Sequence, residues 1–139
     1  MSSNDDIYQK VILEHNRNPK FHEIPEGYTH HGESSNALCG DHIEIYFKVL
    51  DQKLADVGFK GIGCAVCKSS ASLLLTSLKG QGVREALDFI NGLDGLLDED
   101  QGDLEVYGDL KAFSVMRKFP TRFKCVKLSW TAAASALKK

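Results

Sequence analysis

The chain has 139 residues, of which 42% are hydrophobic and 26% are charged, and we expect residues 1–139 to form one globular domain with one core. Lysine and arginine total 17 against 19 aspartates and glutamates, so the formal net charge is -2. This balance argues against a nucleic-acid partner, because nucleic-acid-binding proteins carry a basic surface. The sequence also lacks an apolar run of membrane-spanning length and a signal-peptide pattern, so we expect a cytoplasmic protein with no membrane partner.

The first predicted element is an amphipathic helix over residues 5–15, in which Ile7 and Val11 recur at helical spacing. It should end before Pro19, because proline disfavours helical geometry in the residue that precedes it. The following segment, residues 17–36, shows no periodicity and is rich in polar residues. We therefore expect an irregular segment there.

A β-hairpin is the next prediction. Residues 42–50 alternate between apolar and polar side chains, residues 51–53 read as a turn, and residues 54–60 supply a second strand. Gly61 and Gly63 should end the pairing.

Helical patterns follow the hairpin. They predict a helix from about residue 65 to a stop at Gly80, a helix over 83–91, a solvated connection over 94–105, a short helical stretch over 109–116 and a last helix from Pro120 onward. The connection holds six acidic residues and no basic one, which is typical of a solvated loop. Because strands and helices are separate along the chain, we predict an α+β fold, with a small hairpin-based antiparallel sheet packed against several α-helices.

The four cysteines are Cys39, Cys64, Cys67 and Cys125. Thiols stay reduced in the cytosol, so four of them indicate metal binding or sulfur chemistry more than a disulfide framework.

Two of these cysteines lie at the ends of the predicted hairpin. Cys39 and Asp41 flank Gly40 just before its first strand, and residues two apart in an extended chain point to the same side. Cys64 follows its second strand at a junction with a helix, whose positive end favours a thiolate. Because a hairpin brings its two ends together, we expect Cys39 and Cys64 to be neighbours in space.

Cys125 lies in the last predicted helix, beside Lys124 and one turn from Arg122. The two basic residues are auxiliary candidates, which either stabilise a thiolate and steer anionic sulfur species or form an ordinary exposed helix face. Three thiolates and the Asp41 carboxylate form a sensible tetrahedral zinc set, and they also suit a transient iron–sulfur cluster. The alternative for any single cysteine is a buried core position.

Cys67 forms a Cys-x-x-Cys pair with Cys64, but the βαβ context of a thioredoxin-like dithiol oxidoreductase is missing. Whether Cys67 faces the site, packs in the core or acts as a resolving thiol stays open. His42 points away from Asp41 in a regular strand and is a candidate only for supporting a ligand. His31 falls in the predicted irregular segment, where a solvated side chain is expected.

Three ordered motifs carry a family resemblance: Cys-Gly-Asp at 39–41, Gly-Ile-Gly-Cys at 61–64 followed by a Ser/Ala-rich stretch at 68–75, and Lys-Phe-Pro-Thr-Arg-Phe-Lys-Cys at 118–125. The opening residues 8–19 add a helix-like stretch with an Asn-Pro stop. Together these features resemble the iron–sulfur cluster assembly proteins of the NifU N-terminal/IscU/SufU family. The chain looks most like the SufU branch, because it has an additional stretch around residues 93–107 and Lys124 where the scaffold branch normally has histidine.

This resemblance implies an IscU/SufE-like fold and a zinc site made by Cys39, Asp41, Cys64 and Cys125. It further implies that Cys39 accepts persulfide sulfur from a pyridoxal-phosphate-dependent cysteine desulfurase, so that the protein is a zinc-dependent sulfurtransferase acting ahead of downstream iron–sulfur assembly proteins. Cys67 departs from the usual pattern of the family.

The sequence leaves three alternative functions open. The first is a scaffold that assembles a [2Fe-2S] cluster within the same family. The second is a structural zinc module, whose metal only ties the hairpin to the last helix. The third is a dithiol redox enzyme that uses Cys64 and Cys67.

Overall fold

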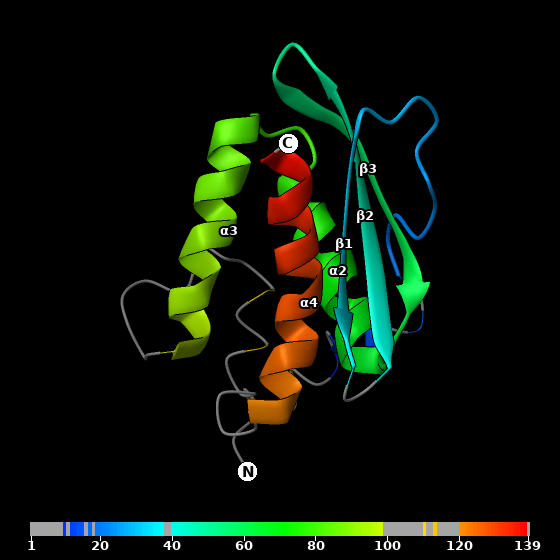
Figure 1. The fold of residues 1–139 in the computed structure, drawn as a ribbon, viewed down its shortest axis with the longest axis vertical. Helices are drawn as coiled ribbons and strands as arrows, with labels where there is room; N and C mark the ends of the chain where they lie inside the picture. Colours follow the sequence, from blue (N-terminus) through cyan, green and yellow to red (C-terminus); the bar gives the residue numbers. More distant parts are fainter. Residues whose placement is uncertain are drawn as a thin grey trace.

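The computed structural model describes residues 10, 12–15, 17, 19–37, 40–98, 110, 113 and 120–138. Its named elements are the strands β1 (His30–Asn36), β2 (Asp41–Leu50) and β3 (Lys53–Ile62), followed by the helices α2 (Ala65–Leu78), α3 (Val83–Asp98) and α4 (Pro120–Leu137) (Figure 1). Residues 12–15 are also helical and belong to the predicted first helix. Most of the predicted short stretch over 109–116 lies outside the described residues. The α+β fold is confirmed.

The predicted hairpin is present as β2 and β3, which pair antiparallel with Ile45 opposite Phe59. Asp51 and Gln52 both have positive φ, at 52° and 64°. Two consecutive residues of this kind make the turn whose twist matches that of paired strands. This turn fixes which residues of the two strands face each other.

The prediction of an irregular segment over residues 17–36 is wrong in its last part, because His30–Asn36 form β1. This strand pairs antiparallel with β2, and the sheet order is β1-β2-β3. The strand lacks apolar alternation because its core-facing side holds Gly32, where a Cβ atom would lie 2.2 Å from the carbonyl oxygen of Ala132 and 2.6 Å from the nitrogen of Ala136. The strand therefore packs on α4 with its backbone. A contact of this kind leaves no pattern of apolar side chains in the sequence, so the strand is not predicted.

The predicted end of the helix near residue 91, and the loop from residue 94, are also corrected. The helix α3 continues to Asp98. Ala86, Ile90 and Leu93 recur at helical spacing and are buried, so the apolar face continues past Asn91. The two glycines in this stretch weaken a helix only modestly, and the burial of Leu93 outweighs them.

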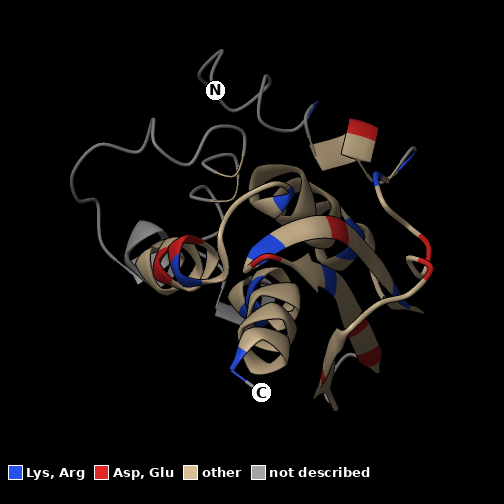
Figure 2. Cartoon of the chain, turned by 90° about the horizontal axis from the view of Figure 1, so that it is seen from above, with Lys and Arg blue, Asp and Glu red and all other residues tan. Residues whose placement is uncertain are grey.

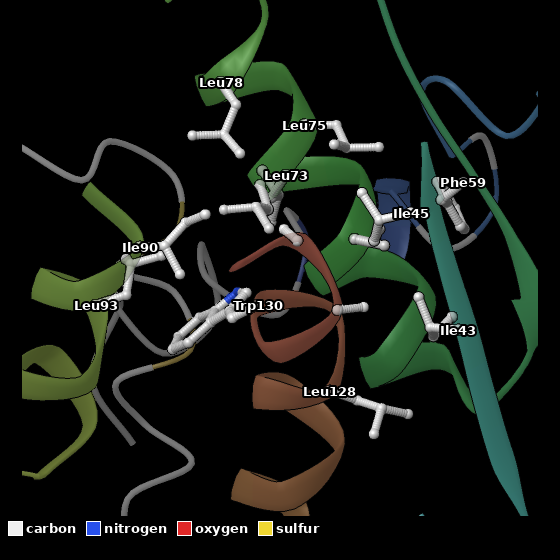
Figure 3. Close-up of a cluster of buried hydrophobic side chains, with 14 of the residues drawn as sticks. Ile43, Ile45, Phe59, Leu73, Leu75, Leu78, Ile90, Leu93, Leu128 and Trp130 are labelled. Atoms are coloured by element: carbon white, nitrogen blue, oxygen red, sulfur yellow. The ribbon is translucent and has the colours of Figure 1, made fainter. Parts of the chain in front are cut away.

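The helix α4 is the centre of the packing. It contacts β1, β2, α2 and α3, and in Figure 1 it lies between α3 and the sheet. Figure 3 shows the side chains that meet around it, with Ile43 and Ile45 approaching from the sheet and Ile90 and Leu93 from α3. The largest fully buried side chains include Phe47, Phe59, Phe113, Leu54, Leu74, Leu75 and Leu78.

None of the helices in the described part of the chain is both long enough and apolar enough to cross a membrane.

The contact of β1 with α4 gives a first prediction. Gly32→Ala places a methyl group against the α4 backbone, so we expect it to lower the free energy of unfolding by about 1–3 kcal/mol or more, as overpacking does. Chemical denaturation measures this. The control is Lys53→Ala on β3, whose side chain is exposed, and which should change stability by about 0.5 kcal/mol or less. Equal stability of the two variants would contradict the close packing.

Candidate metal centre

Three potential metal ligands meet where β2 begins, β3 ends and α4 passes. Asp41 is the first residue of β2, Cys64 immediately precedes α2, and Cys125 lies in the second turn of α4. The ligand atoms of these side chains all lie within 4.8 Å of one another. Residues far apart in the sequence thus bring two sulfur atoms and one carboxylate oxygen close together.

The Asp41 carboxylate is the member of this group that most needs a bound cation. Its side chain is buried, and its Oδ2 atom has no hydrogen-bond partner among the described residues. Leaving a buried polar atom unsatisfied costs about 1–3 kcal/mol, and more when the group is charged. A bound cation would satisfy this oxygen, so the residues present fit a metal ion.

Gly63 lets the chain that follows β3 pass close to both Cys67 and Asp41. A Cβ atom at Gly63 would lie 3.0 Å from the Cβ and Sγ atoms of Cys67 and 3.6 Å from Cγ of Asp41. Any larger residue would push into the space between α2 and the carboxylate. Sequence patterns identify the glycine but not this role, which depends on contacts across elements.

The contact between α2 and α4 sets the place of Cys125. The hydroxyl of Ser70 in α2 donates to the carbonyl oxygen of Val126 at 2.7 Å and lies 3.3 Å from the hydroxyl of Ser129. Ser70 and Ser129 are fully buried, and their small side chains let the two helices approach. This hydrogen bond holds the residue next to Cys125 against the helix that begins after Cys64.

The three ligands differ in exposure. Cys64 is exposed, whereas Cys125 and Asp41 are buried. Cys64 lies at the amino-terminal end of α2, which carries the partial positive charge of the helix dipole. No side-chain hydrogen bond caps this helix at Cys64, so the thiol is not used to satisfy backbone groups. The site is therefore open on the side of Cys64 and closed on the side of α4.

Cys39 lies outside the described residues, so its predicted place beside Cys64 stays a prediction. The neighbouring backbone is described: the amide of Gly40 donates to the carbonyl oxygen of Asn36 at 2.8 Å and closes the turn that leads into Asp41.

The structure buries Cys67 completely in the core cluster. Its sulfur does not belong to the group formed by Asp41, Cys64 and Cys125 among the described residues. Of the three roles left open by the sequence, the core position agrees best with this burial.

Two of the auxiliary candidates belong to the helix that carries Cys125. Lys124 is exposed on α4, and Arg122 belongs to the same helix, but its side chain lies outside the described part. The Nδ1 atom of His42 lies 2.6 Å from the hydroxyl of Ser35. The ring of His42 therefore contacts β1 and is not placed to support Asp41.

A second group of ligand atoms was missed by sequence reasoning. His31, Glu33 and Glu44 have ligand atoms that also lie within 4.8 Å of one another. His31 and Glu33 belong to β1, the strand that the sequence pattern did not reveal. If β1 is recognised as a strand, His31 and Glu33 fall on the same face of it, because alternate residues of a strand share one face.

Comparison with known proteins supports the family resemblance. Residues 7–126 match the family described as NifU-like N terminal domain. The iron–sulfur cluster assembly scaffold protein IscU of Thermotoga maritima is 32% identical over 96% of this chain and 94% of its own length. The zinc-dependent sulfurtransferase SufU of Bacillus subtilis is also 32% identical, over 97% of this chain and 92% of its own length.

A crystal structure of a candidate iron–sulfur cluster assembly scaffold protein of the SUF system, from Fervidobacterium islandicum, superposes with a TM-score of 0.87. It is 29% identical and covers 98% of this chain and 99% of its own. The family match spans most of the sequence, and it includes all three ligands brought together by the fold. The chain therefore belongs to the NifU-like N terminal domain family, the family of the IscU and SufU proteins.

Proposed function

We propose that this protein works in iron–sulfur cluster assembly, where it accepts persulfide sulfur from a cysteine desulfurase at a zinc-bound cysteine site. The observation that carries the proposal is the buried Asp41 carboxylate oxygen, which lies beside two cysteine sulfurs and has no hydrogen-bond partner in the part of the chain that the structure describes. The names of the relatives support it, since one is a zinc-dependent sulfurtransferase and another is a cluster assembly scaffold.

The zinc ligands in this proposal are Cys39, Asp41, Cys64 and Cys125. Three thiolates and one carboxylate match the ligand types and the number that tetrahedral zinc takes in proteins. Zinc bound there would keep the thiols deprotonated and protect them from stray oxidation. In the structure the buried Cys125 and Asp41 would hold the metal from within.

Cys39 is the proposed sulfur acceptor. Its thiolate attacks the outer sulfur of the desulfurase persulfide, the bond between the two persulfide sulfurs breaks, and the desulfurase cysteine leaves as a thiolate. Cys39 then carries the persulfide, and no external oxidant or reductant is consumed. Cys125 is too deeply buried to meet a partner's cysteine, whereas the exposed Cys64 is the rival acceptor that an experiment must separate.

A scaffold function is the second candidate, because the IscU relative is as similar to this chain as the SufU relative. Thiolates with an exchangeable oxygen ligand also bind iron–sulfur clusters. The cluster would then be the cargo of the site. Visible absorption after reconstitution with iron and sulfide distinguishes the two functions, since zinc is colourless.

Metal content gives the second prediction. Asp41→Ala, Cys64→Ser and Cys125→Ser each remove one proposed ligand, so we expect each variant to bind zinc at least about tenfold more weakly. Elemental analysis and competition with a chromophoric chelator measure this. The matched control is Cys67→Ala, which removes a buried sulfur three residues from Cys64 and should keep the zinc. Loss of zinc from the control, with retention in the other variants, would contradict the ligand set.

Sulfur transfer gives the third prediction. Purified protein should stimulate cysteine desulfurase turnover, and Cys39→Ser should abolish the stimulation because no thiolate receives the sulfur. Turnover of cysteine to alanine measures this, and mass spectrometry should find an added sulfur on Cys39 of the wild type.

The outcomes separate the alternatives. Full stimulation by Cys39→Ser would contradict the assignment of Cys39 as the acceptor. Either Cys64 would then accept the sulfur, or the protein would not accept it at all. No stimulation by the wild type, together with unfolding on zinc removal, would identify a structural zinc module. Disulfide reduction that depends on Cys64 and Cys67 but not on zinc would identify a redox enzyme.

A further inference from the structure

The outer face of β1 and β2 carries a second set of metal-ligating side chains. The Nε2 atom of His31 lies 3.2 Å from Oε1 of Glu44 and 3.9 Å from Oε2 of Glu33. His42 lies beside this group, with its Nε2 atom 3.9 Å from Oε2 of Glu44. Two imidazoles and two carboxylates thus converge on this face.

The sheet register builds this set. Glu33 of β1 lies directly opposite Glu44 of β2, and His31 lies opposite Tyr46. Asp41 and Glu44 are three residues apart, and successive residues of a strand point to opposite faces. The second set is therefore separated from the Asp41 group by the sheet itself.

Tyr46 holds the Glu44 carboxylate in place. The Tyr46 hydroxyl donates to Oε1 of Glu44 at 3.0 Å, and its ring lies 4.7 Å from the ring of His31. This hydrogen bond is the main cause that lowers the pKa of Glu44, so the carboxylate stays ionised. Metal-ligating carboxylates are commonly oriented by such a neighbouring donor.

The charges on this face favour a cation. Like charges directly opposite each other across two strands are destabilising, and Glu33 and Glu44 are such a pair. Lys60 is opposite Glu44 on β3, but no ion pair joins these two side chains in the described chain. The ring nitrogen of histidine is a common metal ligand.

We propose that His31, Glu33 and Glu44 form a second metal site, which binds a first-row divalent cation without sulfur ligands. Imidazole and carboxylate ligands suit zinc, manganese, ferrous iron and cobalt. Metal–ligand bonds of about 2.1 Å place ligand atoms roughly 3–3.5 Å apart. His31 Nε2 and Glu44 Oε1 are joined by a hydrogen bond of 3.2 Å, and a cation that replaces its proton would find the two atoms already at a suitable separation. The exposed Glu33 side chain can close the remaining gap. Three protein ligands leave coordination positions open to water or to a small ligand.

Cobalt(II) tests this proposal, because thiolate-bound cobalt has an intense sulfur-to-metal charge-transfer band that nitrogen and oxygen ligands lack. Equilibrium dialysis of the wild type should find two bound Co²⁺ ions per chain, with the charge-transfer band reporting only the site near Asp41. Glu44→Gln and His31→Ala should each weaken the second Co²⁺ at least about tenfold while the band is unchanged.

Two controls accompany this experiment. Glu26→Gln makes the same charge change at an exposed position elsewhere and should keep both ions. Cys64→Ser should weaken the ion at the thiolate site and keep the other, so failure of one site is distinguishable from failure of the other. Circular dichroism checks that each variant is folded. The proposal would be overturned if the only Co²⁺ bound by the wild type gave the thiolate charge-transfer band, or if a Co²⁺ without that band were insensitive to both Glu44→Gln and His31→Ala.

Discussion

The contact between α4 and the sheet is the interaction on which the rest of the structure depends. At Gly32 the strand β1 meets the helix backbone directly, with no side chain between them. This closeness lets one helix contact the sheet, α2 and α3 together. Because α4 is fixed from several directions, Cys125 is held at the ends of β2 and β3. Helix α4 contains two lysines and one arginine and no acidic residue, and the bands along its visible turns in Figure 2 are accordingly blue.

The buried carboxylate couples this packing to chemistry. Folding removes Asp41 from water and leaves one of its oxygens without a hydrogen-bond partner in the described ranges, which opposes folding. Any ion that binds this oxygen in the native state adds its binding free energy to the stability of the fold. The same residue would therefore link metal occupancy to the free energy of unfolding.

The sequence predicts most of what local patterns encode. Alternation over residues 42–50 identifies the hairpin, and the motifs at 39–41 and 61–64 identify Asp41 and Cys64 as candidates, which the fold brings beside Cys125. Prediction from the sequence fails where the structure of a segment depends on contacts with another element. Gly32 marks a strand only because α4 touches it, and the end of α3 depends on what buries Leu93. The His31 group was invisible for the same reason, since it exists only once β1 is paired with β2.

The turn at Asp51 and Gln52 governs more than the hairpin that it closes. A slip of one residue along β2 would exchange its two faces, turning Asp41 toward solvent and Glu44 toward the core. The register shift between Lys48 and Val49 lies between the turn and these residues, so it helps set which face each side chain occupies. The backbone geometry of this turn, at the far end of the sheet, would then keep the sulfur ligands near Asp41 on one face and the oxygen ligands near Glu44 on the other. The turn residues themselves belong to neither set.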